Sequence, residues 1–251
     1  MKRLAIFGSI RLLIFFTLIT PSLHAQLSRD DSVFYVKAVA SAITVYHQNL
    51  GDQSGLYNGS QNAGYSFSFQ SGGHPYFLTS ELGRGSIVYD NVFYPDVLLK
   101  YDETAELVVF QDPKHQIQLI SERIARFSIT DNNFIRIEKD DSLSNSIVRT
   151  GFYNLLYDGK VQALKKEVKV IREELRSNSE GILRFIDIST YHYIKKNNEY
   201  FPVNSKGAIM DIFKDRKKEI QQYIKTNKLN FKKDRDNMLI KVSALYDQLT
   251  K

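Results

Sequence analysis

The first periodic run of apolar residues has the spacing of an amphipathic helix. Tyr35, Val39 and Ala42 recur every three or four residues, which predicts a helix over residues 31–50. Gly51 stands where a left-handed residue commonly follows a helix end. We therefore expect the folded part of the chain to begin with one helix.

Residues 52–203 show a different pattern, in which short apolar runs alternate with polar turn signals. Residues 51–73 are rich in Gly, Ser, Asn and Gln and predict an irregular entry. Asp158-Gly159 is a strong short-range hairpin signal. Short runs at this spacing favour an antiparallel meander over βαβ units. The predicted strands cover residues 75–79, 85–89, 92–101, 105–111, 116–120, 123–130, 134–138, 152–157, 160–175, 183–190, 191–194 and 200–203.

Helical spacing returns over residues 204–251. Ser205 can cap a helix that is predicted to end near Thr226, and Arg216 interrupts its apolar face. Asp234 can cap a last helix, in which apolar positions again repeat at three and four. Two amphipathic helices joined in this way form a helical hairpin, which must cover an apolar surface.

Together these patterns predict an α+β protein. We expect a curved, mainly antiparallel sheet, with the N-terminal helix and the C-terminal helical hairpin packed on it. The predicted organisation is one domain over residues 26–251, made of an N-terminal helix (26–51), a β-rich body (52–203) and the helical hairpin (204–251). A chain of this length can bury roughly 70% of its unfolded surface.

The first 25 residues predict export. Lys2, Arg3 and Arg11 precede a short apolar run, which Pro21 and Ala25 follow, and this is the order of a secretory signal peptide. A signal anchor is the alternative, but a spanning helix needs roughly 20 apolar residues and this run is shorter. We expect a mature protein outside the cytoplasm, with no transmembrane span and no nucleic acid partner.

Composition and charge refine this prediction. Cys is absent, which excludes disulfides, thiol catalysis and thiolate metal sites, so the exported fold must rely on its core. Residues 206–251 carry 12 Lys/Arg against 6 Asp/Glu. This basic tail is either a solvated helical face or a surface that docks on an acidic partner, anionic lipid headgroups or the protein's own acidic body. The candidate partner-facing residues are Lys214, Lys217, Lys218 and Lys225.

Motifs of known chemistry are missing from the sequence. We find no nucleophile elbow, P-loop, dinucleotide fingerprint or HExxH helix. Asp211 and Asp215 share a predicted helix face but stand among lysines. Residues 234–237 resemble the start of a calcium loop without its glycine or its distant glutamate. We therefore predict no catalytic residue, no metal site and no cofactor.

One stretch combines residue types that suit ligand binding. Tyr57, Asn58, His74 and Tyr76 lie in glycine-rich surroundings. Glycine lets a backbone approach a ligand closely, and a Tyr ring offers a flat face and a polar tip. These four residues are our candidate site for a glycan or a peptide. The alternative is that the glycines form a turn into the first strand while the tyrosines fill the sheet.

Several segments resemble a group of uncharacterised exported proteins of Bacteroidetes bacteria. The segments are Leu-Tyr-Asn-Gly (56–59), Gly-His-Pro-Tyr-Phe (73–77), Gly-Ser-Ile-Val-Tyr-Asp (85–90), Val-Leu-Leu-Lys-Tyr-Asp (97–102), Gly-Phe-Tyr-Asn-Leu-Leu-Tyr-Asp-Gly-Lys (151–160) and Lys-Leu-Asn-Phe-Lys-Lys-Asp (228–234). The resemblance covers most of the mature chain. It implies a Gram-negative envelope setting, periplasmic or extracellular, and it transfers no established activity and no catalytic residue.

The function that we expect from the sequence is non-enzymatic binding of a ligand or partner in the cell envelope. Predicted export, the missing motifs, the aromatic residues and the basic tail motivate this interpretation. A hydrolase that acts on glycan or peptide is one alternative, and it would show two carboxylates about 5–10 Å apart in a cleft. An assembly subunit of an envelope complex is the other, and it would show an exposed apolar patch of several hundred Å².

Overall fold

The computed structural model describes residues 35–42, 44–45, 55–112, 114–139, 147–176 and 181–250. The predicted signal peptide (1–25) and the cap at Gly51 lie outside the described residues. Residues 35–42 and 44–45 are helical, which confirms the predicted N-terminal helix over that part. The Thr44 hydroxyl donates to the carbonyl of Ala40 at 2.8 Å within this helix. That the helix packs on the sheet stays a prediction.

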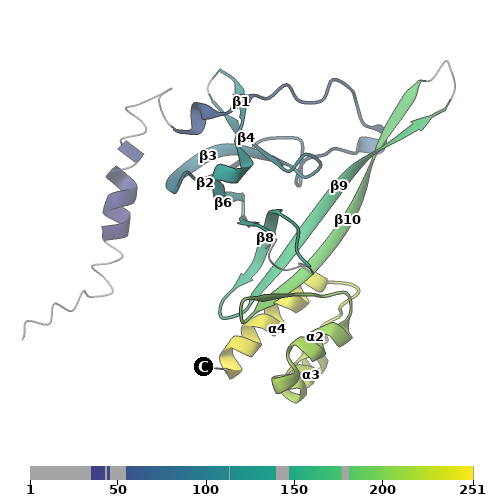
Figure 1. Ribbon diagram of the computed structural model, residues 1–251. Coiled ribbons are helices and arrows are strands. Elements are labelled where there is room, and N and C mark those ends of the chain that lie inside the picture. The colour runs from purple at the N-terminus through teal and green to yellow at the C-terminus, as the bar shows by residue number, and fades with distance from the viewer. Residues whose placement is uncertain are drawn as a thin grey trace, which may run out of the picture. The chain divides into compact units, whose positions relative to one another are not determined.

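Within the described residues, eleven strands form one antiparallel sheet that is not closed, as the sequence predicts (Figure 1). Their order across the sheet is β1-β5-β4-β3-β2-β6-β7-β8-β9-β10-β11. The strands are β1 (Ser60–Gln61), β2 (Gly83–Tyr89), β3 (Val92–Asp102), β4 (Leu107–Gln111), β5 (Gln116–Gln118), β6 (Ile124–Ile129), β7 (Asn132–Ile137), β8 (Gly151–Asp158), β9 (Gln162–Leu175), β10 (Ile182–Lys196) and β11 (Glu199–Pro202).

Three predicted strand segments differ from the observed strands. The predicted strands 183–190 and 191–194 join into β10, which pairs with β9 without a register shift. The predicted strand 75–79 contributes only one bridge, from Tyr76 to Asp102. Leu78 explains this, because its φ of 55° ends the extended conformation.

The sheet curls strongly, as contacts between distant strands show. The ring centroids of Tyr101 on β3 and Phe152 on β8 lie 5.7 Å apart, although four strand-to-strand steps separate them. In a flat sheet, four steps would span about 19 Å. The strands from β3 to β8 therefore wrap around their own side chains.

The turn after β3 and the segment of residues 73–77 connect β3 with β8 and β9 across the curl. After β3, the carboxylate of Glu106 accepts hydrogen bonds from the Lys166 ammonium and, at 3.2 Å, from the backbone N–H of Phe152. The N–H of Glu103 donates to the Pro75 carbonyl at 2.9 Å, and the Lys169 ammonium donates to the Tyr76 carbonyl. Residues 73–77 therefore fasten the end of β3 to β9.

Aromatic rings fill the inside of the curl. Phe127 and Phe134 stack at 4.7 Å, and both also contact the ring of Tyr101. A void of only about 10 Å³ remains beside these rings. Since one water needs about 10–15 Å³, the interior is a packed core without room for a ligand.

The C-terminal helices pack on the sheet, as predicted. They are α2 (Lys206–Ile212), α3 (Lys217–Thr226) and α4 (Arg235–Leu249), with a 3₁₀ turn, η5 (Lys214–Arg216), before α3. Ser205 and Asp234 cap α2 and α4 as predicted, accepting from the N–H groups of Ala208 and Asn237. The predicted helix that reaches Thr226 is interrupted after α2, where Phe213 leaves the helical conformation at ψ 36° and is fully buried.

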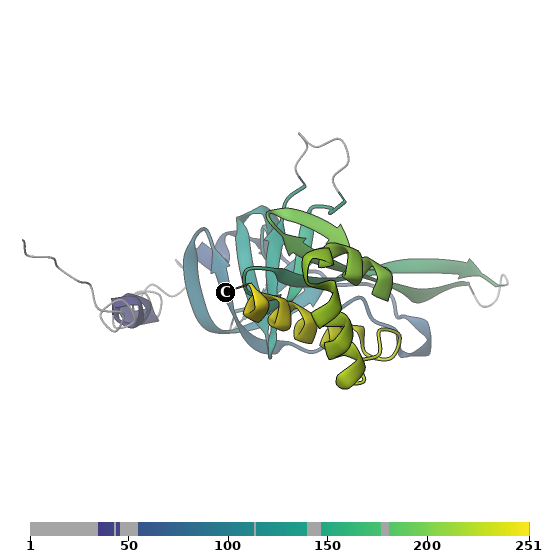
Figure 2. The same cartoon turned by 90° about the horizontal axis from the view of Figure 1, so that it is seen from below.

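Helix α4 is anchored beside the turn between β8 and β9 (Figures 1 and 2). The buried carboxylate of Asp247 accepts hydrogen bonds from the N–H of Lys160 at 2.7 Å, the N–H of Val161 at 3.3 Å and the Tyr157 hydroxyl at 3.1 Å. A Cβ at Gly159 would lie 2.0 Å from Oδ2 of Asp247, so a larger residue there would displace the Asp247 carboxylate. The Asp-Gly hairpin of the sequence is thus also the docking point of the last helix.

Candidate functional site

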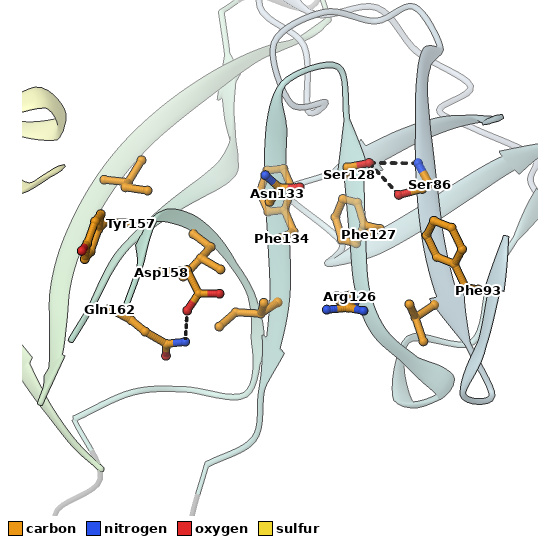
Figure 3. A pocket seen from close by; sticks show the side chains of 14 residues that line it. Ser86, Phe93, Arg126, Phe127, Ser128, Asn133, Phe134, Tyr157, Asp158 and Gln162 are labelled. Atoms are coloured by element: carbon orange, nitrogen blue, oxygen red, sulfur yellow. Dashed lines mark hydrogen bonds between the residues drawn. The ribbon is translucent and has the colours of Figure 1, made fainter. Parts of the chain in front are cut away.

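A hollow with a volume of about 690 Å³ lies on the outer face of the curled sheet (Figure 3). We call it the outer trough. Strands β2, β3, β6, β7 and β8 contribute to it, together with the start of β9. It is lined by Ser86, Val88, Phe93, Arg126, Phe127, Ser128, Asn133, Phe134, Ile135, Leu155, Leu156, Tyr157, Asp158 and Gln162.

The alternation of side chains along β6 explains why polar groups reach this face. Phe127 and Ile129 point into the core inside the curl and are 3% and 6% exposed. Arg126 and Ser128 are their neighbours in the strand, so they point to the opposite face. On β2, Ser86 is directly opposite Ser128, and their hydroxyl oxygens lie 2.9 Å apart (Figure 3).

Arg126 has no neutralising partner among the described residues. It stands opposite Val88 on β2 and Ile135 on β7, and neither side chain can accept a hydrogen bond. Two other arginines are paired: Arg123, in the 3₁₀ turn before β6, with Asp90 at 2.6 Å, and Arg184 of β10 with Glu173 at 2.7 Å. Arg126 therefore offers a guanidinium to the trough between apolar walls.

The single carboxylate that lines the trough is already engaged. Asp158 accepts a hydrogen bond from the Gln162 amide at 2.8 Å (Figure 3). The neighbouring Tyr157 hydroxyl donates to Asp247, and burial followed by this hydrogen bond raises its pKa. The trough thus holds the positive charge of Arg126, the negative charge of Asp158, the Ser86 and Ser128 hydroxyls, the Asn133 amide and several apolar side chains.

The structure places His74 and Tyr76, two of the predicted ligand-binding residues, together. Their rings stack at 6.5 Å, and the ammonium of Lys100 lies 4.3 Å from the Tyr76 ring centroid. Burial and the nearby Lys169 lower the pKa of His74. Both residues belong to the segment that fastens β3 to β9, and neither lines the outer trough.

The other two predicted residues lie in the 3₁₀ turn η2 (Gly55–Asn58). The Tyr57 ring packs edge-on against Phe110 of the core at 5.8 Å. Asn58 lines a shallow hollow of about 470 Å³ beside β5. No contact among the described residues joins this pair to His74 or Tyr76, so the glycan or peptide site stays a prediction.

One buried and one partly exposed carboxylate line the small void inside the curl. Glu103 is 2% exposed, and its Oε2 lies 3.2 Å from the ammonium of Lys169. Burial raises the pKa of Glu103 to about 7, although Lys169 acts in the opposite direction. Glu167 lines the same void, whose volume is about 10 Å³. Two carboxylates thus line the same void, but the void is too small to admit a glycan or peptide substrate.

The predicted basic surface is exposed to solvent. All four predicted lysines are exposed on η5 and α3: Lys214, Lys217, Lys218 and Lys225. On the opposite face of α3, Ile220 and Ile224 are buried in the core between the helices and the sheet. This agrees with a solvated helical face and leaves the lysines available to an acidic partner.

Sequence reasoning missed the outer trough, although one signal for part of it was present. Residues 126–129 alternate between polar and apolar side chains, so Arg126 and Ser128 were assignable to the polar face of a strand. What the sequence could not show is that the strand neighbours of Arg126 are apolar.

Comparisons with known proteins assign no family to the chain: no family model, no curated protein and no solved structure matches it. Among the described residues, no helix has the length and apolar character needed to cross a membrane. No group of three or more His, Asp or Glu within that part of the chain is placed to hold a metal ion.

Proposed function

We propose that this protein is a non-enzymatic binding protein of the cell envelope that holds an anionic ligand with an apolar body in the outer trough. The observation that carries the proposal is Arg126, an unpaired guanidinium in a hollow of about 690 Å³. Small-molecule sites commonly have volumes of 300–1,000 Å³, with apolar walls and few polar groups. The predicted signal peptide supports the envelope setting.

The geometry favours a ligand with one negative group. The Arg126 guanidinium can bind a carboxylate through two parallel hydrogen bonds, since its donors form a planar fork. The Ser86 and Ser128 hydroxyls and the Asn133 amide lie on neighbouring strands and can complete the polar contacts. Val88, Phe93 and other apolar side chains then cover the body of the ligand.

Decanoate and decanol are matched probes for this site, because both have a ten-carbon chain and only decanoate carries a negative charge. We expect the protein to bind decanoate more tightly than decanol in isothermal titration calorimetry. Arg126→Met should weaken decanoate binding about tenfold or more, since a hydrogen bond to a charged group contributes about 1.5–3 kcal/mol. Decanol binding should change little.

Arg84→Met is the matched control, because Arg84 pairs with Asp96 at the surface and does not line the trough. This variant should bind decanoate like the wild type. Equal decanoate affinity of the wild type and Arg126→Met would contradict the proposal.

A second candidate function, an assembly subunit, is supported by the edge of β10. β11 pairs only with the last four residues of β10, from Tyr193 to Lys196. Before them, Ile188 and Tyr191 are 58% and 47% exposed, on a strand edge with which no other described strand pairs. Such an edge can accept a strand from a partner.

A photo-crosslinking amino acid at position 188 tests this second candidate in intact cells. We expect one discrete adduct at this position and none at position 241, which is also exposed but lies on α4. Absence of an adduct at 188, or the same adducts at both positions, would contradict an assembly role of this edge.

A further inference from the structure

A second hollow, distinct from the outer trough, lies where α2 begins and where the link from α3 reaches α4. Its volume is about 510 Å³, and we call it the link hollow. It is lined by Asn204, Ser205, Lys206, Leu229, Asn230, Phe231, Lys232 and Arg235.

Three positive side chains from separate segments converge on the link hollow. Lys206 is the first residue of α2, Lys232 lies in the link, and Arg235 is the first residue of α4. No carboxylate is among the lining residues. This contrasts with Lys165, Lys166 and Lys169 of β9, which all form ion pairs with acidic side chains.

The backbone and one side chain of the link hollow are held in place before any ligand arrives. The Asn230 side chain accepts hydrogen bonds from the N–H groups of Lys232 and Lys233 at 3.0 and 3.1 Å, which fixes the turn of the link. The Arg235 guanidinium lies 4.4 Å from the Phe231 ring centroid. Its Nη1 also lies 3.4 Å from Nδ1 of His192, so both contacts position the guanidinium, and no acid among the described residues forms an ion pair with it.

We propose that the link hollow binds the phosphate of a phosphomonoester. A phosphomonoester carries nearly two negative charges at neutral pH, which matches a site with three cations and no acid. The guanidinium fork suits two phosphate oxygens, and the lysines act as point charges. Leu229 and Phe231 provide an apolar wall for the organic part of the ligand.

Phenyl phosphate is the soluble probe, and phosphatidylcholine vesicles with and without phosphatidic acid test a lipid source of the same group. We expect Lys206→Gln and Lys232→Gln each to weaken phenyl phosphate binding about tenfold. Lys217→Gln and Arg84→Met should leave it unchanged, because neither residue lines the link hollow or the outer trough. Phenyl sulfate, with a single charge, should bind more weakly.

The outcomes separate the alternatives. Binding of phenyl phosphate alone supports a soluble ligand, and additional binding to phosphatidic acid vesicles supports a lipid headgroup; both support the phosphomonoester site. An equal loss in Lys217→Gln would overturn the proposal, because a diffuse basic surface would then be responsible. Equal affinity for phenyl sulfate, or binding of neither probe, would overturn it as well.

Discussion

Replacing Lys169 with methionine is expected to lower the free energy of unfolding by about 3–5 kcal/mol at pH 8, the usual cost of leaving a buried charge unpaired. Lys169 and Glu103 are 6% and 2% exposed, and Lys169 also donates to the Tyr76 carbonyl. At pH 5 the loss should be clearly smaller, because Glu103 is then protonated and no buried charge is left alone. Urea unfolding at both pH values measures the difference.

The sign of the pH dependence follows from the raised pKa of Glu103. Burial raises this pKa from its ordinary value of 4.5 to about 7, so the folded protein binds the proton more tightly than the unfolded chain. The contribution of Glu103 to stability is therefore complete below pH 4.5 and is lost as the pH rises to about 7. Glu103→Gln should remove this part of the pH dependence.

A double variant controls for the loss of packing. Glu103→Leu combined with Lys169→Met removes both charges and should recover most of the stability, since apolar pairs often replace buried ion pairs without loss. If Lys169→Met lost the same stability at pH 5 and pH 8, an ionised Glu103 could not be the cause.

Replacing Phe152 with alanine is expected to lower the free energy of unfolding by about 3–5 kcal/mol. Phe152 is 1% exposed and contacts Tyr101 and Phe127 from strands that the curl brings together. Its removal opens a cavity that the surrounding rings cannot fill. Chemical denaturation followed by circular dichroism measures the effect.

Phe93→Ala is the matched control, because Phe93 is 39% exposed on the outer face. Its loss should cost less than about 1 kcal/mol, since little apolar surface leaves a packed environment. Similar losses in both variants would contradict the packing inside the curl.

Most strands were predicted because the alternation and the turn residues that indicate a strand are neighbours in the sequence. The alternation along β6 and the Asp158-Gly159 turn are visible in the sequence and are confirmed in the structure. The helix that was expected to continue to Thr226 breaks at Phe213, because burial of this side chain against the core outweighs helical continuity. Tertiary packing therefore determines where this helix ends.

The candidate site was not predictable because its parts come from separate strands. Arg126 is unpaired only because the register places Val88 and Ile135 beside it, and register between strands is not a local property. Likewise, the contact between Tyr101 and Phe152 depends on the curl of the whole sheet. The sequence motif around His74 and Tyr76 proved to include backbone contacts that fasten this curl.

A crystal structure of residues 26–251 grown with decanoate would show directly whether the outer trough binds an anion at Arg126. We predict that the carboxylate lies within about 3 Å of the Arg126 guanidinium, at the distance of a charge-assisted hydrogen bond. The alkyl chain should lie against Val88, Phe93 and Leu155. Decanoate bound elsewhere, with no ligand in the trough, would contradict anion binding at Arg126.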